Sequence, residues 1–184
     1  MKQFPYYQSD RWKIIAQTDL PYLPTPAEVI EQIFVFLRQH KLLQSRKSLI
    51  DLGAGDGRVI LLAAQEYGLR SVGLEINKEL IRSVEKKIQN KNLIQKCEIL
   101  ERDLYDFDVS TFDIVFCFVL PSSHRHFRHV VEHFKEDALV ISIRYDLNDF
   151  GDLLHLDYAF TDGENSEKMF GDDFQAFLYR KTSE

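Results

Sequence analysis

Few cysteines, no long apolar run and no recognisable metal spacing narrow what this chain of 184 residues can be. Its two cysteines, Cys97 and Cys117, lie in strand-like runs without a neighbouring histidine, which favours buried reduced thiols over a nucleophile or a disulfide framework. His126, His129 and His133 share one side of a predicted helix, but no carboxylate or cysteine joins them at a zinc spacing, so no metal site is predicted. No stretch approaches the roughly 18 apolar residues of a membrane span, and the first residues lack the apolar core of a signal peptide. We therefore expect a cytoplasmic protein that does not enter a membrane.

An excess of positive charge is also missing. The chain has 23 lysine and arginine residues against 29 aspartate and glutamate residues, a net charge of -6. This balance does not supply the dense positive field that phosphate neutralisation demands, so we expect no nucleic-acid partner. It favours a basic partner, such as a protein that presents lysine side chains. At this length we predict one domain over residues 1–184, and we expect a monomer.

What the sequence does contain is a glycine-rich turn, at residues 48–58 (SLIDLGAGDGR), between a strand-like run and a run of helix formers. Such a turn exposes free backbone N–H groups at a helix start, as in a nucleotide-binding corner. Gly53, Gly55 and Gly57 depart from the Gly-x-Gly-x-x-Gly spacing of dinucleotide sites, and no Gly-Lys-Ser/Thr of a phosphate-binding loop follows. A turn that holds no ligand is the alternative.

Two carboxylates, Asp51 and Asp56, decide which ligand fits this turn. Beside a pyrophosphate they would be repulsive, whereas they attract a positively charged ligand. S-adenosylmethionine carries both an ammonium group and a sulfonium. We therefore predict that Asp51 and the three glycines of the turn bind S-adenosylmethionine as the cofactor.

The ends of the next two predicted strands carry further candidate cofactor-binding residues. Glu75 ends the second strand some twenty residues after the turn, where a carboxylate accepts hydrogen bonds from a ribose. Ile76 behind it would offer an apolar face to the adenine. Asp103 follows the third strand, with Leu104 beside it, and we interpret it as the acceptor for the adenine amino group. An ordinary loop aspartate is the alternative for Asp103.

Residues 112–120 form a nearly continuous apolar run, as expected of a central strand buried on both faces. Its tip, from Phe118 onward, should face the reacting end of the cofactor. A fifth strand is predicted over 138–143, and residues 154–160 and 174–179 indicate an antiparallel pair at the sheet edge. The prediction is an α/β fold: a Rossmann-like, doubly wound, seven-stranded sheet that is mostly parallel, with an antiparallel edge hairpin.

Aromatic residues are frequent in the first twenty positions, which is unlike a disordered tail. We expect residues 1–24 to form an N-terminal arm or a lid over the cofactor cleft. Thr25 and Glu28 have the spacing of a capping box, and Pro26 suits a first helical position. A helix is therefore predicted to begin here.

Together, the glycine turn, Glu75 and Asp103 resemble motifs one, two and three of the class I, seven-strand S-adenosylmethionine-dependent methyltransferases. A narrower resemblance lies in residues 22–26 (YLPTP), 52–59 (LGAGDGRV) and 142–145 (SIRY), which are similar to the archaeal broad-specificity protein-lysine methyltransferases and related mitochondrial lysine methyltransferases. This resemblance implies methylation of protein lysine side chains. It also implies that Tyr22 and Thr25 approach the methionine end of the cofactor.

Methyl transfer is an in-line displacement, so an enzyme contributes mainly the alignment of donor and acceptor. A lysine amine attacks only when it is neutral, and desolvation or a nearby sulfonium lowers its pKa. We assign no general base. Tyr22, Tyr145 and the backbone carbonyls near Leu120 are the catalytic candidates, each for orienting the amine.

The strand tip at residues 118–121 (FVLP) is not the Asn/Asp-Pro-Pro-Tyr signature of methyltransferases that act on adenine or glutamine amides. Its absence argues against those acceptors without establishing lysine. Two alternatives remain open from the sequence: a small-molecule methyltransferase on the same scaffold, and a non-catalytic module that binds S-adenosylmethionine.

Overall fold

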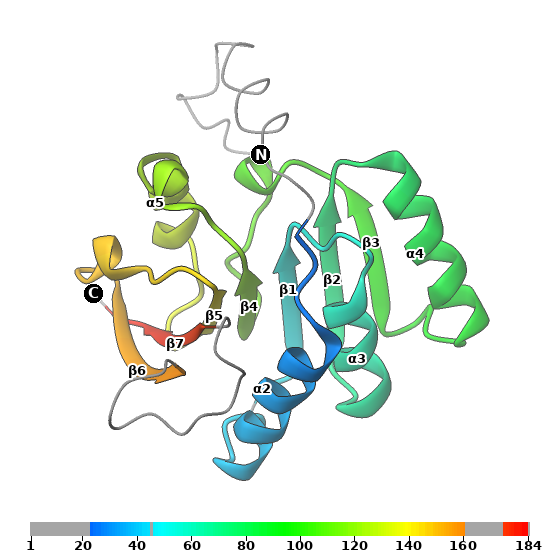
Figure 1. Ribbon diagram of the computed structural model, residues 1–184, viewed down its shortest axis with the longest axis horizontal. Coiled ribbons are helices and arrows are strands. Elements are labelled where there is room, and N and C mark those ends of the chain that lie inside the picture. Colours follow the sequence, from blue (N-terminus) through cyan, green and yellow to red (C-terminus); the bar gives the residue numbers. More distant parts are fainter. Residues whose placement is uncertain (1–22, 45, 161–174, 184) are drawn as a thin grey trace.

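The computed structural model describes residues 23–44, 46–160 and 175–183, and these form one sheet of seven strands (Figure 1). The strands are β1 (Ser48–Leu52), β2 (Arg70–Glu75), β3 (Cys97–Glu101), β4 (Ile114–Cys117), β5 (Leu139–Ile143), β6 (Leu154–Phe160) and β7 (Ala176–Lys181). Their order in the sheet is β3-β2-β1-β4-β5-β7-β6. Neighbouring strands from β3 to β5 run parallel, and β7 is antiparallel to both β5 and β6. The predicted fold class is confirmed.

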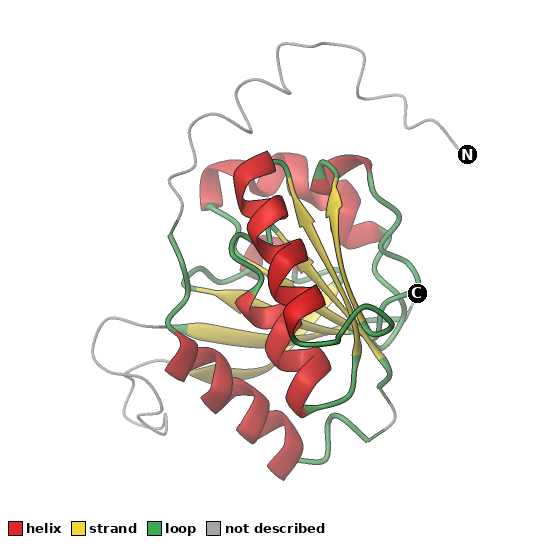
Figure 2. Cartoon of the chain, turned by 90° about the vertical axis from the view of Figure 1, so that its right-hand side faces the viewer, coloured by secondary structure: helices red, strands yellow, loops and turns green. Residues whose placement is uncertain are grey.

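Helices cover both faces of this sheet. They are α2 (Ala27–Gln39), α3 (Arg58–Glu66), α4 (Lys78–Asn90) and α5 (His124–Glu132), with short 3-10 turns η1 (Leu104–Asp106), η2 (Pro121–Ser123) and η3 (Asn148–Phe150). The apolar faces of α2, α3 and α4 share one core with the sheet, and α5 packs in a second core on the opposite face. Figure 2 shows the strands enclosed between nearer and more distant helices. In the described part of the chain, no helix has the length and apolar character needed to cross a membrane.

The order of the strands reverses beside β1. From β1 the chain adds β2 and β3 on one side, and then returns to place β4 and β5 on the other. The helices that follow the neighbouring strands β1 and β4, which are α3 and α5, therefore leave toward opposite faces, and this opens a crevice at the carboxyl ends of these two strands. Ligands of open α/β sheets bind at this switch point.

The side chains of β1 alternate between the two faces of the sheet, and this alternation determines which of them faces the crevice. Leu49 packs in the core on the side of α2 to α4, whereas Ile50 and Leu52 pack in the core on the side of α5. Asp51 shares the side of Leu49 and is buried like its neighbours. A strand covered on both faces thus carries, one residue before its end, a carboxylate that solvent barely reaches.

β4 is shorter than predicted. Its last residue, Cys117, pairs with Leu52 of β1 and with Ser142 of β5, and these are the last parallel pairs on either side. β1 ends at Leu52, so Phe118 has no partner on that side, and the chain leaves the sheet there although β5 continues to Ile143. Residues 118–120, which the sequence placed in the strand, instead form a loop at the crevice.

The start of α2 also differs from the prediction. Pro26 is the N-cap residue and no side chain caps the helix, so the capping box of Thr25 and Glu28 does not form. With Pro26 outside the first turn, Thr25 lies one position too early to reach the free N–H groups. By contrast, the side chain of Asn77 caps α4 and accepts from the N–H groups of Glu79 and Leu80.

Most of the N-terminal segment, including Tyr22, lies outside the described residues. The arm or lid predicted for residues 1–24 therefore stays a prediction. Its described part, Leu23 and Pro24, leads into α2 and lies at the cavity described below.

The close packing of β2 against the glycine turn gives a stability prediction. A Cβ atom added at Gly73 would lie 2.6 Å from the Ala54 Cβ and 2.9 Å from the Cδ1 atoms of Ile60 and Ile99. We expect Gly73→Ala to lower the free energy of unfolding by about 1–3 kcal/mol, the usual effect of overpacking. Urea denaturation measures it, with Gly151→Ala as the control because a Cβ there meets its nearest atom at 3.4 Å. Equal losses in the two variants would contradict the packing argument.

Candidate active site

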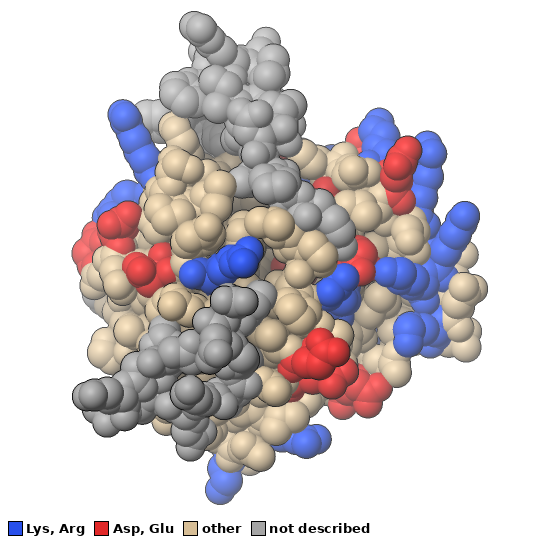
Figure 3. Space-filling model, in the orientation of Figure 1, with Lys and Arg blue, Asp and Glu red and all other residues tan. Residues whose placement is uncertain are grey.

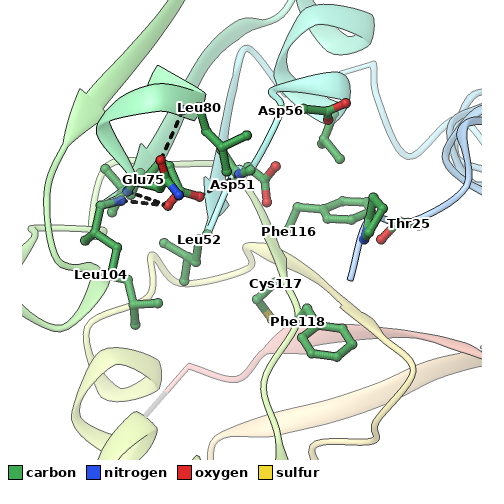
Figure 4. Close-up of a pocket in the computed structure, with 18 of the residues that line it drawn as sticks. Thr25, Asp51, Leu52, Asp56, Glu75, Leu80, Leu104, Phe116, Cys117 and Phe118 are labelled. Carbon is green, nitrogen blue, oxygen red and sulfur yellow. Dashed lines mark hydrogen bonds between the residues drawn. The ribbon is translucent and has the colours of Figure 1, made fainter. Parts of the chain in front are cut away.

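A cavity of about 470 Å³ opens at the carboxyl ends of β1, β2 and β4. Separate parts of the chain form its walls, and most lining residues lie in 23–25, 51–56, 74–77, 102–105 and 116–118. Figure 4 shows these walls, with Asp51 between Glu75 on one side and Asp56 and Thr25 on the other. The topology of the sheet alone brings them together, since they are spread over most of the described chain.

The glycine turn has a backbone conformation that favours glycine. Gly53, Gly55 and Gly57 all adopt positive φ angles, of 93°, 54° and 77°. The N–H groups of Gly53 and Ala54 donate to the Leu74 carbonyl at 3.0 and 2.8 Å, which fastens the turn to the end of β2. Gly53 and Gly55 line the cavity, whereas Gly57 lies behind it. A Cβ on Gly57 would lie 2.7 Å from Val84 of α4, so this glycine permits close packing of the turn on that helix.

Asp51 is the most unusual group in the cavity. Its residue is only 6% exposed, and burial raises the pKa of its carboxyl to about 8, with further contributions from the charges of Glu75 and Asp56. Among the described residues, none donates a hydrogen bond to this carboxylate. A buried carboxylate without a compensating partner suits a cation that enters from the cavity.

Glu75 is held firmly by backbone donors. One oxygen accepts from the Gly55 N–H at 2.8 Å, and the other accepts from the N–H groups of Ile76 and Asn77 at 2.8 and 2.9 Å (Figure 4). The carboxylate thereby joins the glycine turn to the start of α4. Each carboxylate oxygen has further acceptor capacity, so hydroxyl groups of a ligand can still donate to it.

Asp56 differs from the other two carboxylates because it is neutralised. Arg58 donates to both of its oxygens at 2.8 Å, and the Lys87 ammonium lies 3.8 Å from one of them. The hydrogen bond from Arg58 is the main cause of the lowered pKa of Asp56. Sequence reasoning identified the charge of Asp56 but missed both partners. The position of Arg58, directly after the glycine turn and two residues from Asp56, is the sequence feature that could have indicated this ion pair.

The residues predicted to contact the adenine lie together at the cavity. Ile76 and Leu104 line the cavity, and Asp103 joins them there. One Asp103 oxygen accepts from the Tyr105 N–H at 3.0 Å and so caps η1. Tyr105, which the sequence did not single out, also lines the cavity.

Only some of the residues predicted to lie near the reacting methyl group and the acceptor amine line the cavity. Phe118 and Thr25 line the cavity together with Leu23, and so do Phe116 and Ile143, which the sequence did not single out. Tyr145 and Leu120 do not line it. Tyr145 instead packs edge-to-face on Phe118, with ring centroids 5.7 Å apart. The Leu120 carbonyl accepts from the Ser123 N–H at 2.8 Å, so it already has a donor.

Cys117 also lines the cavity. Burial raises the pKa of its thiol to about 12, which keeps it protonated. It is therefore a buried and unreactive thiol, as expected from the sequence.

The burial of Asp51 gives a prediction about pH. Its pKa is higher in the folded chain than the value of about 4 expected in the unfolded chain, so the folded state binds this proton more tightly. The free protein should therefore lose stability as the pH rises from about 4 to about 8, where Asp51 ionises. We expect Asp51→Asn to remove this loss, so that its gain in melting temperature over the wild type is larger at pH 8 than at pH 5.

Asp113 is the control for this experiment. Burial alone would raise its pKa, but hydrogen bonds from Lys135, Lys47 and Ser48 outweigh burial and lower it to about 2. Asp113→Asn should therefore destabilise the protein at neutral pH. If the two asparagine variants shifted the melting temperature in the same direction at pH 8, the electrostatic assignment would be wrong.

One protein-family model, described as the ANTKMT methyltransferase domain, matches residues 51–152. The matched segment begins at Asp51 and runs past β5. It therefore includes the glycine turn and the strand ends that form most of the cavity.

Two characterised relatives are similar over larger parts of the chain. A protein-lysine N-methyltransferase of Saccharolobus islandicus is 25% identical over 158 residues, which is 79% of this chain and 96% of the relative. A human lysine N-methyltransferase, named for a subunit of ATP synthase, is 28% identical over 127 residues, 68% of this chain. The chain spans about half the length of the human relative, 52%.

Among solved structures, an RNA methyltransferase from Salinibacter ruber in complex with S-adenosyl-L-homocysteine is similar, with a TM-score of 0.69 and 25% identity. The match covers 88% of this chain and 95% of that chain. The family model matches more than half of the length of the present chain. This chain therefore belongs to the family of the ANTKMT methyltransferase domain.

Proposed function

We propose that this protein transfers methyl groups from S-adenosylmethionine to the lysine side-chain amines of proteins. The observation that carries the proposal is Asp51, a buried carboxylate that faces the cavity without a partner among the described residues. It lies at the start of the segment matched by the methyltransferase family. The characterised relatives in Saccharolobus islandicus and human are both named as lysine N-methyltransferases, which supports lysine as the acceptor.

The residues of the cavity fit S-adenosylmethionine. The volume of about 470 Å³ lies within the range of small-molecule sites. Asp51 suits the ammonium group, the free acceptor positions of Glu75 suit ribose hydroxyls, and Ile76 and Leu104 suit the adenine. Asp103, which lines the cavity beside them, suits the adenine amino group. When bound, this donor supplies a methyl carbon that the positive sulfur makes electrophilic.

The acceptor wall has a different chemistry. Phe118, Phe116 and Ile143 give it an apolar surface, and Leu23 adds to it from the segment before α2. Such a wall excludes water and disfavours a charged ammonium, so it lowers the pKa of an entering lysine and favours the neutral amine that attacks. Alignment of that amine with the methyl carbon is then the main contribution of the protein.

Three residues are candidates for orienting the amine. We propose that Tyr145 acts by fixing the ring of Phe118, since the two rings are in edge-to-face contact. The Leu120 carbonyl retains a lone pair beyond its bond with Ser123. Tyr22 lies outside the described residues, and its role at the methionine end of the cofactor stays a prediction.

RNA is the competing acceptor, because the solved neighbour is named as an RNA methyltransferase. The net charge of -6 disfavours RNA, and acidic and basic side chains are interspersed on the face drawn in Figure 3. Residues 118–121 offer no polar side chain ahead of Ser122 to hydrogen-bond a base amino group. A protein acceptor therefore fits better. The cytoplasmic location and the monomeric state stay predictions.

A labelling experiment tests the proposal. The purified chain is incubated with S-adenosylmethionine labelled in its methyl group and with either a cellular protein extract or total RNA. We expect label in protein lysines, located by mass spectrometry, and a loss of at least about 100-fold in Asp51→Ala, because cofactor alignment is lost. Asp152→Ala is the matched control, since this exposed carboxylate pairs with Arg128 and does not line the cavity.

The other outcomes separate the alternatives. Label that appears only in RNA, or only in small molecules of the extract, would contradict a protein-lysine acceptor. Binding of S-adenosylmethionine without transfer to any of these acceptors would indicate a non-catalytic binding module.

A further inference from the structure

Arg58 is the first residue of α3 and directly follows the glycine turn. Its side chain is 31% exposed and lines the cavity. The guanidinium donates to both oxygens of Asp56, from Nε to Oδ1 and from Nη2 to Oδ2, each at 2.8 Å. This is the two-pronged arrangement in which an arginine and a carboxylate fix each other's orientation.

A third bond of the same guanidinium joins it to a distant part of the chain. Nη1 donates to the Thr25 carbonyl at 2.6 Å, over a separation of 33 residues in the sequence. Thr25, Pro24 and Leu23 form the wall that precedes α2, and Figure 4 shows Thr25 on the same side of the cavity as Asp56. One side chain therefore joins the glycine turn to a wall that belongs to another part of the chain.

Asp56 is itself held from the opposite direction. The Lys87 ammonium of α4 donates to the Asp56 carbonyl at 2.8 Å. Gly57, the next residue, packs so closely on Val84 of α4 that a Cβ would not fit. The contacts thus run without a gap from α4 through the turn and Arg58 to the wall before α2.

From these contacts we infer that Arg58 is a positioning residue for cofactor binding. It holds the wall of Leu23 to Thr25 at a fixed distance from the glycine turn, and it neutralises Asp56. The field on a positively charged ligand then comes from the other two carboxylates of the cavity, Asp51 and Glu75. A lysine could not replace it, because one ammonium group lacks the planar fork that serves both Asp56 and Thr25.

This inference rests on the cofactor half of the proposed function and is independent of the acceptor. It is tested by the affinity for S-adenosylhomocysteine, measured by calorimetry, because that ligand binds without any acceptor. We expect Arg58→Met to weaken binding by about tenfold or more, since three bonds that shape the cavity are lost. Arg58→Lys should remain at least about fivefold weaker than the wild type, because charge alone does not restore the fork.

Arg180 of β7 provides the matched control. It is 34% exposed, and it also bonds two partners, Asp137 and Asp157, but it does not line the cavity. Arg180→Met should lower the melting temperature by a similar amount to Arg58→Met and leave the affinity within about twofold of the wild type. Equal effects of Arg58→Met and Arg180→Met on affinity would overturn the inference, as would full restoration by Arg58→Lys.

Asp56→Asn keeps the inference testable if Arg58→Met does not fold. Asparagine offers a single acceptor oxygen and no charge, so we expect weaker binding of S-adenosylhomocysteine by about threefold or more. Wild-type affinity in Asp56→Asn would overturn the inference. Failure of the wild-type chain to bind S-adenosylhomocysteine would overturn the proposed function instead, so the two failures are distinguishable.

Discussion

The cavity depends on one electrostatic constraint, the placement of the Asp51 carboxylate at the end of a strand that is buried on both faces. Desolvation penalises its charged form, and no described residue compensates it. In the free protein the group therefore favours its protonated form at neutral pH. A bound cation would reverse that preference, so cation binding and the ionisation of Asp51 are thermodynamically linked.

Three carboxylates surround the glycine turn, and the structure gives each a different role. Glu75 accepts three backbone hydrogen bonds and joins the turn to α4, Asp56 is neutralised by Arg58 and Lys87, and Asp51 stays uncompensated. If all three carried unshielded charge, their mutual repulsion would destabilise the turn. Because Asp56 is paired with cations and Glu75 is hydrogen-bonded to the backbone, the uncompensated negative charge is localised at Asp51, where a cation can enter.

The sequence predicted those parts of the fold and site that depend on local pattern. The glycine-rich turn between a strand and a helix, and the end of the second strand at Glu75, follow from residue type and spacing over short segments, and the structure agrees. The end of β4 was not predictable from the local apolar pattern, because it coincides with the end of the neighbouring strand β1 at Leu52. Arg58 was missed for a related reason: its bond to Thr25 depends on a contact between residues that only the tertiary fold brings together. Tyr145 likewise contacts Phe118 and lies behind the cavity wall, which no spacing rule could indicate.

The early end of β4 explains why one cavity can serve two chemically different reactants. Because the chain leaves the sheet at Phe118, an aromatic ring rather than another ladder residue borders the crevice on the β4 side. The β1 and β2 side presents carboxylates and backbone groups, which suit a cationic donor. The β4 and β5 side presents apolar surface, which favours a neutral amine over an ammonium. This division of the cavity follows from the order of the strands, since charged strand ends lie on one side of the switch point and apolar ones on the other.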